Sequence, residues 1–174
     1  VGITFRPGAR ELWATNNGRD WLGDNQPPET VYRVRQGDDA GWPACHAARI
    51  VDPEHGSPGA CRGVLEPEVE MQAHTAPLGL TFYTGDRFPA DYRGDLFFAL
   101  HGSWNRTVPV GYKVVRIPLQ GGQTGAVENF VSGWLQEDGS SWGRPVDVLT
   151  SPAGGMFISD DTAGPLFHVS YLGQ

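Results

Sequence analysis

The stretch DLFFALHGSWNR, Asp95 to Arg106, contains two different patterns. Leu96 to Leu100 form an apolar run with aromatic residues, which is typical of a buried β-strand. His101 to Arg106 then supply hydrogen-bonding and cationic groups without any hydrophobic taper. These polar residues either cap an ordinary exposed turn or contribute to a shared site at the end of the strand.

Three segments of the chain repeat this pattern, beginning at Val1, Leu78 and Val146. Each has a short alternating strand, a Gly/Pro turn, and a second apolar strand that runs into polar residues. A third strand follows in each case, in TVYRVR, YKVVRIPL and LFHVSY. The starts lie roughly seventy residues apart, so the chain reads as a series of internal repeats. Each repeat therefore indicates three or four antiparallel strands.

One four-stranded sheet per repeat, arranged radially, is a blade of a β-propeller. Three blades do not close a ring, because propellers have about four to eight. We therefore predict an all-β, six-bladed β-propeller to which this chain contributes about three blades, at residues 1–70, 71–140 and 141–174, within one domain. A β-sandwich is the structural alternative. In a propeller the polar strand ends would meet around the central channel: Asn16–Arg19, His101–Arg106 and Ser159–Thr162.

Composition narrows the class of protein further. The 174 residues include 24 Gly and 14 Pro, which favours many turns. The net charge of −7 without a basic stripe argues against nucleic acid and anionic membrane surfaces as partners. No membrane-spanning segment is visible in the sequence. Because the chain opens at Val1 inside an apparent strand, we expect it to be a piece of a longer protein.

The two cysteines, Cys45 and Cys61, lie in a loop-like stretch rich in Pro, Gly and His. A disulfide closing a loop of roughly fifteen residues would contribute about 3 kcal/mol in the chain-entropy model. That pairing suits an oxidising compartment, so we expect a periplasmic or secreted protein. Two unpaired buried cysteines in a cytosolic protein are the alternative.

Several motifs occur in one order along the chain: ATNNGRDWLGDNQPPETVYRV, GWPAC, HTAPLGLTFY, HGSWNR and RPVDVLTSPAGGMFISDDTAG. Together they resemble the glucose/sorbosone dehydrogenases, soluble sugar and aldose dehydrogenases that use pyrroloquinoline quinone (PQQ) on a six-bladed propeller. HGSWNR with HTAPLGL resembles the sorbosone branch most. The resemblance extends from Val1 to about Tyr171 and covers the second half of the family's propeller.

The resemblance implies an enzyme that oxidises a sugar by hydride transfer to PQQ, with Ca²⁺ on the cofactor. A sugar and an electron acceptor are then the expected partners, together with the N-terminal half of the propeller. The family's catalytic base is a His from an early blade that no segment here matches, so we expect no catalytic residue in this chain. The alternative is a non-enzymatic extracellular propeller that binds protein or carbohydrate on its funnel face.

The resemblance also assigns candidate metal ligands. Gly18 and Arg19 fall where the family offers two backbone carbonyls to the Ca²⁺ that sits on PQQ. Calcium is a hard cation that main-chain oxygens satisfy well. Glu29 falls where one branch binds a structural Ca²⁺.

The remaining matches concern the quinone itself. Asn105 and Arg106 lie on the strand end that delivers amide or cationic groups to PQQ, although one branch carries Lys at the position of Asn105. Arg144 matches the family's final cationic contact, and such donors suit a cofactor with three carboxylates. Asp147 either orients Arg144 or begins a strand. His74 falls near the quinone or is a structural histidine.

Overall fold

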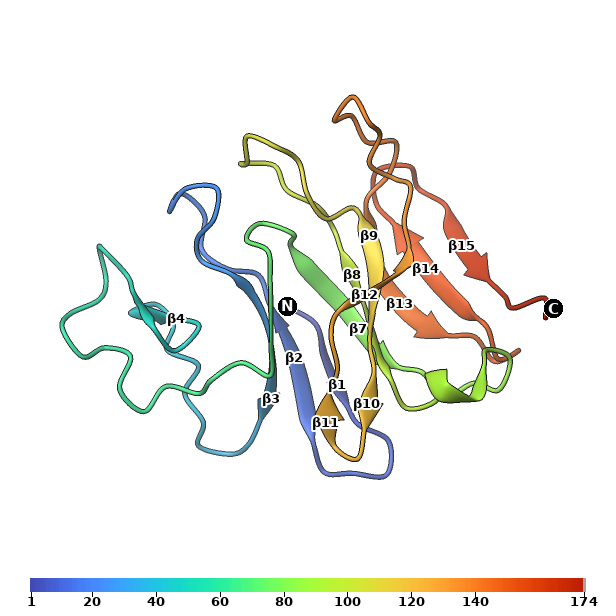
Figure 1. Ribbon diagram of the computed structural model, residues 1–174, viewed down its shortest axis with the longest axis horizontal. Helices are drawn as coiled ribbons and strands as arrows, with labels where there is room; N and C mark the ends of the chain where they lie inside the picture. Colours follow the sequence, from blue (N-terminus) through green and yellow to red (C-terminus); the bar gives the residue numbers. More distant parts are fainter. Residues whose placement is uncertain (174) are drawn as a thin grey trace.

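The computed structural model describes residues 1–173, and Figure 1 shows them as a row of antiparallel sheets. The regular structure in this range consists of β-strands, with one 3₁₀ turn, η1 (Ala90–Tyr92), and no α-helix. The prediction of an all-β fold is confirmed. None of the helical structure in residues 1–173 is long and apolar enough to span a membrane.

The first sheet is a four-stranded meander. Its strands lie in sequence order: β1 (Ile3–Phe5), β2 (Leu12–Asn16), β3 (Glu29–Val34) and β6 (Val69–Met71). The pairing of β2 with β3 is in continuous register over five residue pairs, so these two strands form the body of the sheet.

A long insertion separates β3 from β6 and projects to one side in Figure 1. It contains the short hairpin of β4 (Cys45–His46) and β5 (Ile50–Val51), which the sequence pattern did not reveal. Cys45 and Cys61 form a disulfide there, as predicted. The disulfide closes a loop within the insertion. It thereby stabilises a segment that has few strand pairs of its own.

The second sheet also has four strands: β7 (Pro77–Phe82), β8 (Leu96–Leu100), β9 (Lys113–Ile117) and β12 (Glu128–Val131). A small hairpin, β10 (Leu119–Gln120) and β11 (Gln123–Thr124), lies between the last two. Every residue of β8 is buried. The reason is that β8 is a central strand of a sheet that is covered on both faces.

The third sheet has three strands: β13 (Pro145–Thr150), β14 (Met156–Asp160) and β15 (Leu166–Val169). The strands β14 and β15 pair over four residue pairs. The apolar face of this sheet, with Met156 and Ile158, packs against the second sheet.

Two apolar clusters hold the three sheets together. One joins the first and second sheets and includes Trp13, Val31 and Phe98. The other joins the second and third sheets and includes Phe97 and Ile158. Because successive side chains of a strand point to opposite faces, neighbouring residues of β8 enter different clusters. This two-sided burial explains why the strand reads as a continuous apolar run instead of an alternating one.

The sheets meet mainly through their early strands, since β7 contacts both β2 and β13. The loops that follow β2 and β8 stand at the same end of the molecule in Figure 1. This arrangement places the polar strand ends of different sheets near one another.

Candidate functional site

A hollow of about 180 Å³ opens at this end of the sheets. Its walls come from the loops after β2 and β8 and from the segments before β7 and β13, so all three sheets contribute. The lining residues are Asn17, Asp20, His74, Ala76, His101, Gly102, Trp104, Asn105 and Arg144. Three residues predicted to bind the cofactor, His74, Asn105 and Arg144, are therefore brought together.

Arg144 is the cation of the hollow. Its Nε donates to the carbonyl oxygen of His101 at 3.1 Å, and Nη2 donates to the carbonyl of Gly102. The guanidinium carbon lies 5.4 Å from the centre of the Tyr112 ring, a cation–π distance. Two carbonyls and one ring thus fix the guanidinium, while no residue within 1–173 accepts a hydrogen bond from Nη1.

His101 connects the hollow to the third sheet. Its Nε2 lies 3.0 Å from Oδ1 and 3.2 Å from Oδ2 of Asp161, which follows β14. The hydrogen bond from His101 holds the pKa of Asp161 below its usual range. The polar end of β14 therefore reaches the site through this carboxylate.

Asn105 presents an unsatisfied group. Its Nδ2 donates to Oδ1 of Asp20 at 2.8 Å, and its Oδ1 is buried without a partner among the described residues. Buried side-chain oxygens nearly always have a hydrogen-bond partner. The amide oxygen is thus suited to a donor on a ligand or to a bound water.

His74 is part of the wall. Its ring is buried, and Nε2 lies 2.8 Å from the carbonyl oxygen of Gly23. Nδ1 lies 3.8 Å from Oδ1 of Asp20, which is an ion-pair distance when the ring is protonated. His74 has a left-handed backbone, with φ of 68°. The histidine therefore joins the loop after β2 to the segment before β7.

Gly18 is not one of the residues that line the hollow, but it directly follows Asn17, which does. Its N–H donates to Oε2 of Glu29 at 2.5 Å, and the N–H of Ala76 donates to Oε1 at 3.4 Å. Glu29 is only 1% exposed, and burial raises the pKa of its carboxyl although these hydrogen bonds oppose the change. Backbone amides thus engage the carboxylate that the resemblance linked to a structural Ca²⁺.

The side chain of Arg19 points to the insertion. Its guanidinium pairs with Asp52 and, at 2.8 Å, with Glu54. Asp52 also lies 2.9 Å from Nε2 of His46. Burial disfavours ionisation of Asp52, but hydrogen bonds from His46 and Arg19 outweigh it and hold its pKa well below the usual range. This cluster attaches the insertion to the turn after β2, so only the backbone of Arg19 is left for a metal.

Arg106 is not on the wall of the hollow, unlike its neighbour Asn105. Its Nη1 donates to the carbonyl oxygens of Asp24 at 2.9 Å and Ala73 at 3.4 Å. The contact of Arg106 with the cofactor stays a prediction, since Nη1 donates to backbone carbonyls while Nε is buried without a partner among the described residues. The guanidinium satisfies backbone carbonyls inside the wall, where it joins the loops that form the site.

Asp147 also lies elsewhere. Its Oδ1 accepts the N–H of Val148 at 2.8 Å, and the residue forms no hydrogen bond with Arg144 within residues 1–173. A side chain at Gly79 would collide with this carboxylate, at 1.8 Å from Oδ1. Of the two roles considered for Asp147, the structure supports the one at the start of a strand, because its side chain is directed toward β7.

Sequence reasoning missed several members of the site. Asp20, which accepts a hydrogen bond from Asn105, was not singled out at all. Asn17, His101 and Asp161 lie in the polar strand ends that the sequence singled out, but no role was assigned to them. The repeated position of polar residues after the second strand of each repeat is the signal that finds them.

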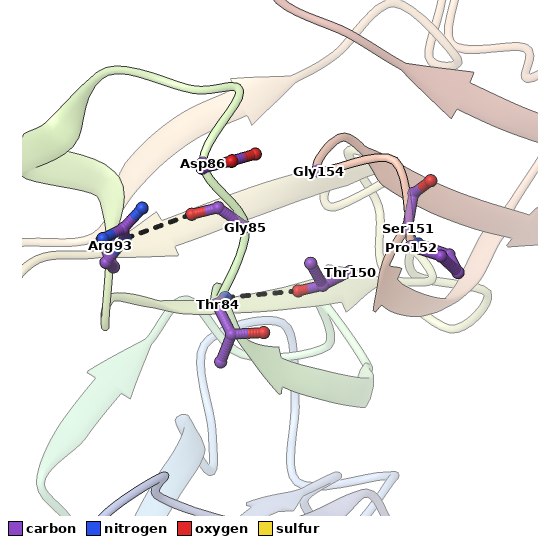
Figure 2. Close-up of a pocket in the computed structure, with 8 residues that line it drawn as sticks. All are labelled: Thr84, Gly85, Asp86, Arg93, Thr150, Ser151, Pro152 and Gly154. Carbon is purple, nitrogen blue, oxygen red and sulfur yellow. Dashed lines mark hydrogen bonds between the residues drawn. The ribbon is translucent and has the colours of Figure 1, made fainter.

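A second hollow, of about 590 Å³, lies at the opposite ends of β7 and β13 (Figure 2). Two of its polar groups bond within the protein: Nε of Arg93 donates to the carbonyl of Gly85 at 3.3 Å, and the N–H of Thr84 donates to Oγ1 of Thr150 at 3.5 Å. The histidine and the amide predicted to bind a cofactor, His74 and Asn105, lie at the other end.

The antiparallel sheets pack side by side, with a polar hollow at one end, and make this an all-β protein whose solved neighbours include PQQ dehydrogenases. A calcium structure of the Trichoderma reesei carbohydrate-active enzyme family AA12 has a TM-score of 0.78 at 20% identity, over 97% of this chain and 50% of that one. The holo form of the pyranose dehydrogenase PQQ domain from Coprinopsis cinerea has a TM-score of 0.69 at 24% identity, over 98% of this chain and 53% of that one. Because the sequence identities are below 25%, this structural similarity shows a shared fold and nothing more.

The chain belongs to the TrAA12-like family, whose sequence pattern matches residues 48–172. An uncharacterized protein of Borreliella burgdorferi is 35% identical over 176 residues, which cover 98% of this chain and 46% of that protein. A pyrroloquinoline quinone-dependent pyranose dehydrogenase of Coprinopsis cinerea is 32% identical over 127 residues, or 62% of this chain and 17% of that protein. The chain thus spans less than half the length of these curated relatives.

Proposed function

We propose that this chain is part of a PQQ- and Ca²⁺-dependent sugar oxidoreductase, which oxidises an aldose or a sorbosone-like aldehyde by hydride transfer to the quinone. The observation that carries the proposal is the hollow in which Arg144, Asn105, His74 and His101 meet from different sheets. The similarity to a PQQ-dependent pyranose dehydrogenase supports it. The HGSWNR and HTAPLGL motifs are the reason for including sorbosone.

The three sheets are, in this proposal, three blades of a six-bladed propeller, at about residues 1–70, 71–140 and 141–174. The solved relatives support this, since 97% or more of this chain matches about half of each of two such chains. The other blades would come from an N-terminal half, which would also supply the histidine that removes the sugar proton. An electron acceptor would reoxidise the cofactor.

The residues of the hollow fit PQQ. The cofactor carries three carboxylates, and Arg144 offers a fixed positive charge with one NH₂ group, Nη1, that no described residue engages. Asn105 adds a buried amide oxygen without a partner, which can accept a hydrogen bond from the pyrrole N–H of the cofactor and not from its carboxylates. Arg144 would neutralise and orient the cofactor, and His74 and His101 would limit its position. When bound, the quinone supplies hydride-acceptor chemistry that no side chain provides.

The proposed calcium site uses fewer protein groups than the proposed PQQ site. Within residues 1–173 there is no cluster of three or more His, Cys, Asp and Glu that could hold a metal. Calcium takes about six to eight oxygen ligands, and these include backbone carbonyls. The proposal therefore assigns the ion to the carbonyls of Gly18 and Arg19 together with carboxylates of the cofactor. Glu29 holds the Gly18 turn in place by its hydrogen bond to the amide.

We also propose a periplasmic or secreted location. The Cys45–Cys61 disulfide supports it, because disulfides persist in oxidising compartments.

The test is a titration of the full-length protein with PQQ in the presence of Ca²⁺, followed by a dye-reduction assay with a panel of sugars. We expect micromolar or tighter binding of PQQ and sugar-dependent reduction of the dye. Arg144→Ala should weaken PQQ binding about 10- to 100-fold, the equivalent of losing a charge-assisted hydrogen bond. Arg10→Ala, at an exposed arginine, is the matched control. Absence of PQQ binding would reject the proposal in favour of a binding protein without the cofactor.

A further inference from the structure

Two tryptophans stand exposed at the rim of the hollow. Trp21 is 75% exposed and Trp104 is 62% exposed, and their rings pack edge to face with centroids 5.2 Å apart. Trp104 lines the hollow, and Trp21 directly follows Asp20, which also lines it. Large aromatic side chains grouped beside a polar cavity are typical of a binding surface.

The two loops do not depend on the tryptophans for their attachment. Asn105 donates to Asp20 at 2.8 Å, Arg106 donates to the carbonyl of Asp24 at 2.9 Å, and the N–H of Thr107 donates to the Asp24 carboxylate at 3.2 Å. These polar bonds already join the loop after β2 to the loop after β8. The faces of the exposed rings are therefore available for another partner.

The backbone conformation of Trp21 also indicates that this residue has a role in binding. Its φ of 69° lies in the left-handed region, which is unfavourable for a residue with a bulky side chain. Strained residues persist where the surrounding structure determines them, and they concentrate at functional sites. The fold thus holds an exposed tryptophan in an unfavourable conformation at the rim of the hollow.

The other exposed tryptophans have ring partners in their own part of the fold. Trp142 stacks on Trp134 with centroids 5.9 Å apart, and Trp42 lies 5.9 Å from the ring of His46. Trp21 and Trp104 instead contact each other across two loops and belong to neither apolar cluster. Their packing within the chain leaves most of each ring uncovered.

The polar groups around the two rings indicate the chemistry of the ligand. Asn17, Asp20 and Asn105 offer amide and carboxylate groups, which bind hydroxyl groups. A pyranose ring has hydroxyl groups at its edge and C–H groups on its faces, so it matches an aromatic surface bordered by such groups. A lipid would leave these polar groups unsatisfied, and the net charge of −7 opposes nucleic acid.

We propose that Trp21 and Trp104 form an aromatic platform that binds a pyranose ring next to the hollow. The proposed function assigns the hollow to PQQ, so the oxidised sugar unit lies against the quinone and the ring on the platform beside it is a further unit of the same sugar chain. The protein therefore binds an oligosaccharide more tightly than a monosaccharide. The choice of sugar as ligand rests on the proposed function, whereas the location of the platform rests on the two exposed rings.

The test uses calorimetry on the full-length protein with glucose, a β-1,4-linked glucotetraose and an α-1,4-linked glucotetraose. We expect at least one tetraose to bind about tenfold more tightly than glucose, as stacking on a large aromatic surface implies. Trp21→Ala and Trp104→Ala should each remove most of this preference. Trp104→Phe, which keeps a ring, should retain part of it, and Trp42→Ala should leave it unchanged.

Equal affinity for glucose and both tetraoses overturns the platform, as does a preference that survives both alanine substitutions. PQQ binding is measured separately on the same variants. Loss of the preference in the tryptophan variants of a protein that does not bind PQQ supports the platform and rejects the proposed function. PQQ binding without any preference for a tetraose supports the proposed function and rejects the platform.

Discussion

The Glu29 carboxylate joins the first sheet to the second, and its removal tests how the hollow is built. It accepts the N–H of Gly18 at 2.5 Å and the N–H of Ala76 at 3.4 Å in a buried place. Glu29→Ala leaves both amides without an acceptor, at about 1–3 kcal/mol for each unsatisfied group. Because the second bond is long, we expect a total loss of about 2–4 kcal/mol in the free energy of unfolding. Glu29→Gln keeps one acceptor oxygen and should lose about half as much.

The raised pKa of Glu29 predicts the direction in which the free energy of unfolding changes with pH. Burial raises the pKa of Glu29 in the folded protein above its ordinary value of 4.5. The unfolded chain therefore releases its proton first as the pH rises, and the folded state loses stability until the pH exceeds the raised pKa. Glu29→Gln does not titrate, so the stability difference between wild type and this variant should be largest at low pH and narrow as the pH rises.

Urea unfolding of the full-length protein at a series of pH values from 4 to 8, by roughly one unit at a time, measures both effects. Glu137→Ala, at an exposed glutamate, is the matched control. A loss below about 0.5 kcal/mol for Glu29→Ala, as for ordinary surface substitutions, would refute the bridging role. If the stability difference between wild type and Glu29→Gln widens as the pH rises, then the hydrogen bonds from the amides, and not burial, dominate the pKa of Glu29.

Two further predictions concern stability. Replacing both cysteines by serine should cost about 3 kcal/mol, because the disulfide closes a loop with a sequence separation of 16; urea unfolding with and without reductant measures this, and an unchanged midpoint contradicts it. Arg116→Met should cost about 3–5 kcal/mol, because it leaves buried Asp95 without the guanidinium that lies 2.6 Å away. The double variant Arg116→Met/Asp95→Leu should recover part of that loss in thermal unfolding, whereas an additive loss would argue against a coupled pair.

The strands of this protein were largely predictable from local patterns. The apolar run of β8 and the second strands of the other repeats appear where the sequence indicates, because each is buried by sheets on one or both sides. The hairpin of β4 and β5 was not predictable, since two-residue strands leave no periodicity. The disulfide that organises this insertion was visible in the spacing of the cysteines.

The site was predictable only in part. The polar strand ends identified Asn105 and, with the family resemblance, His74 and Arg144, which all line the hollow. Arg106 differs because its guanidinium finds the carbonyls of Asp24 and Ala73, and such loop contacts depend on the folded backbone. Asp161 lies in a polar strand end that the sequence singled out, but its partner, a histidine sixty residues away, was visible only in the folded chain.

The backbone angles around the hollow have a consequence for protein engineering. Trp21, His74, Ala76 and Tyr112, four residues in or beside the site, have φ values between 53° and 69°. Glycine adopts such angles without steric penalty, but His74, Ala76 and Tyr112 are buried, so glycine there would also remove packing. At Trp21, which is 75% exposed, selection for thermal stability alone will favour glycine, and the ring at the rim of the hollow will be lost. Selection must therefore score binding or turnover and melting temperature together.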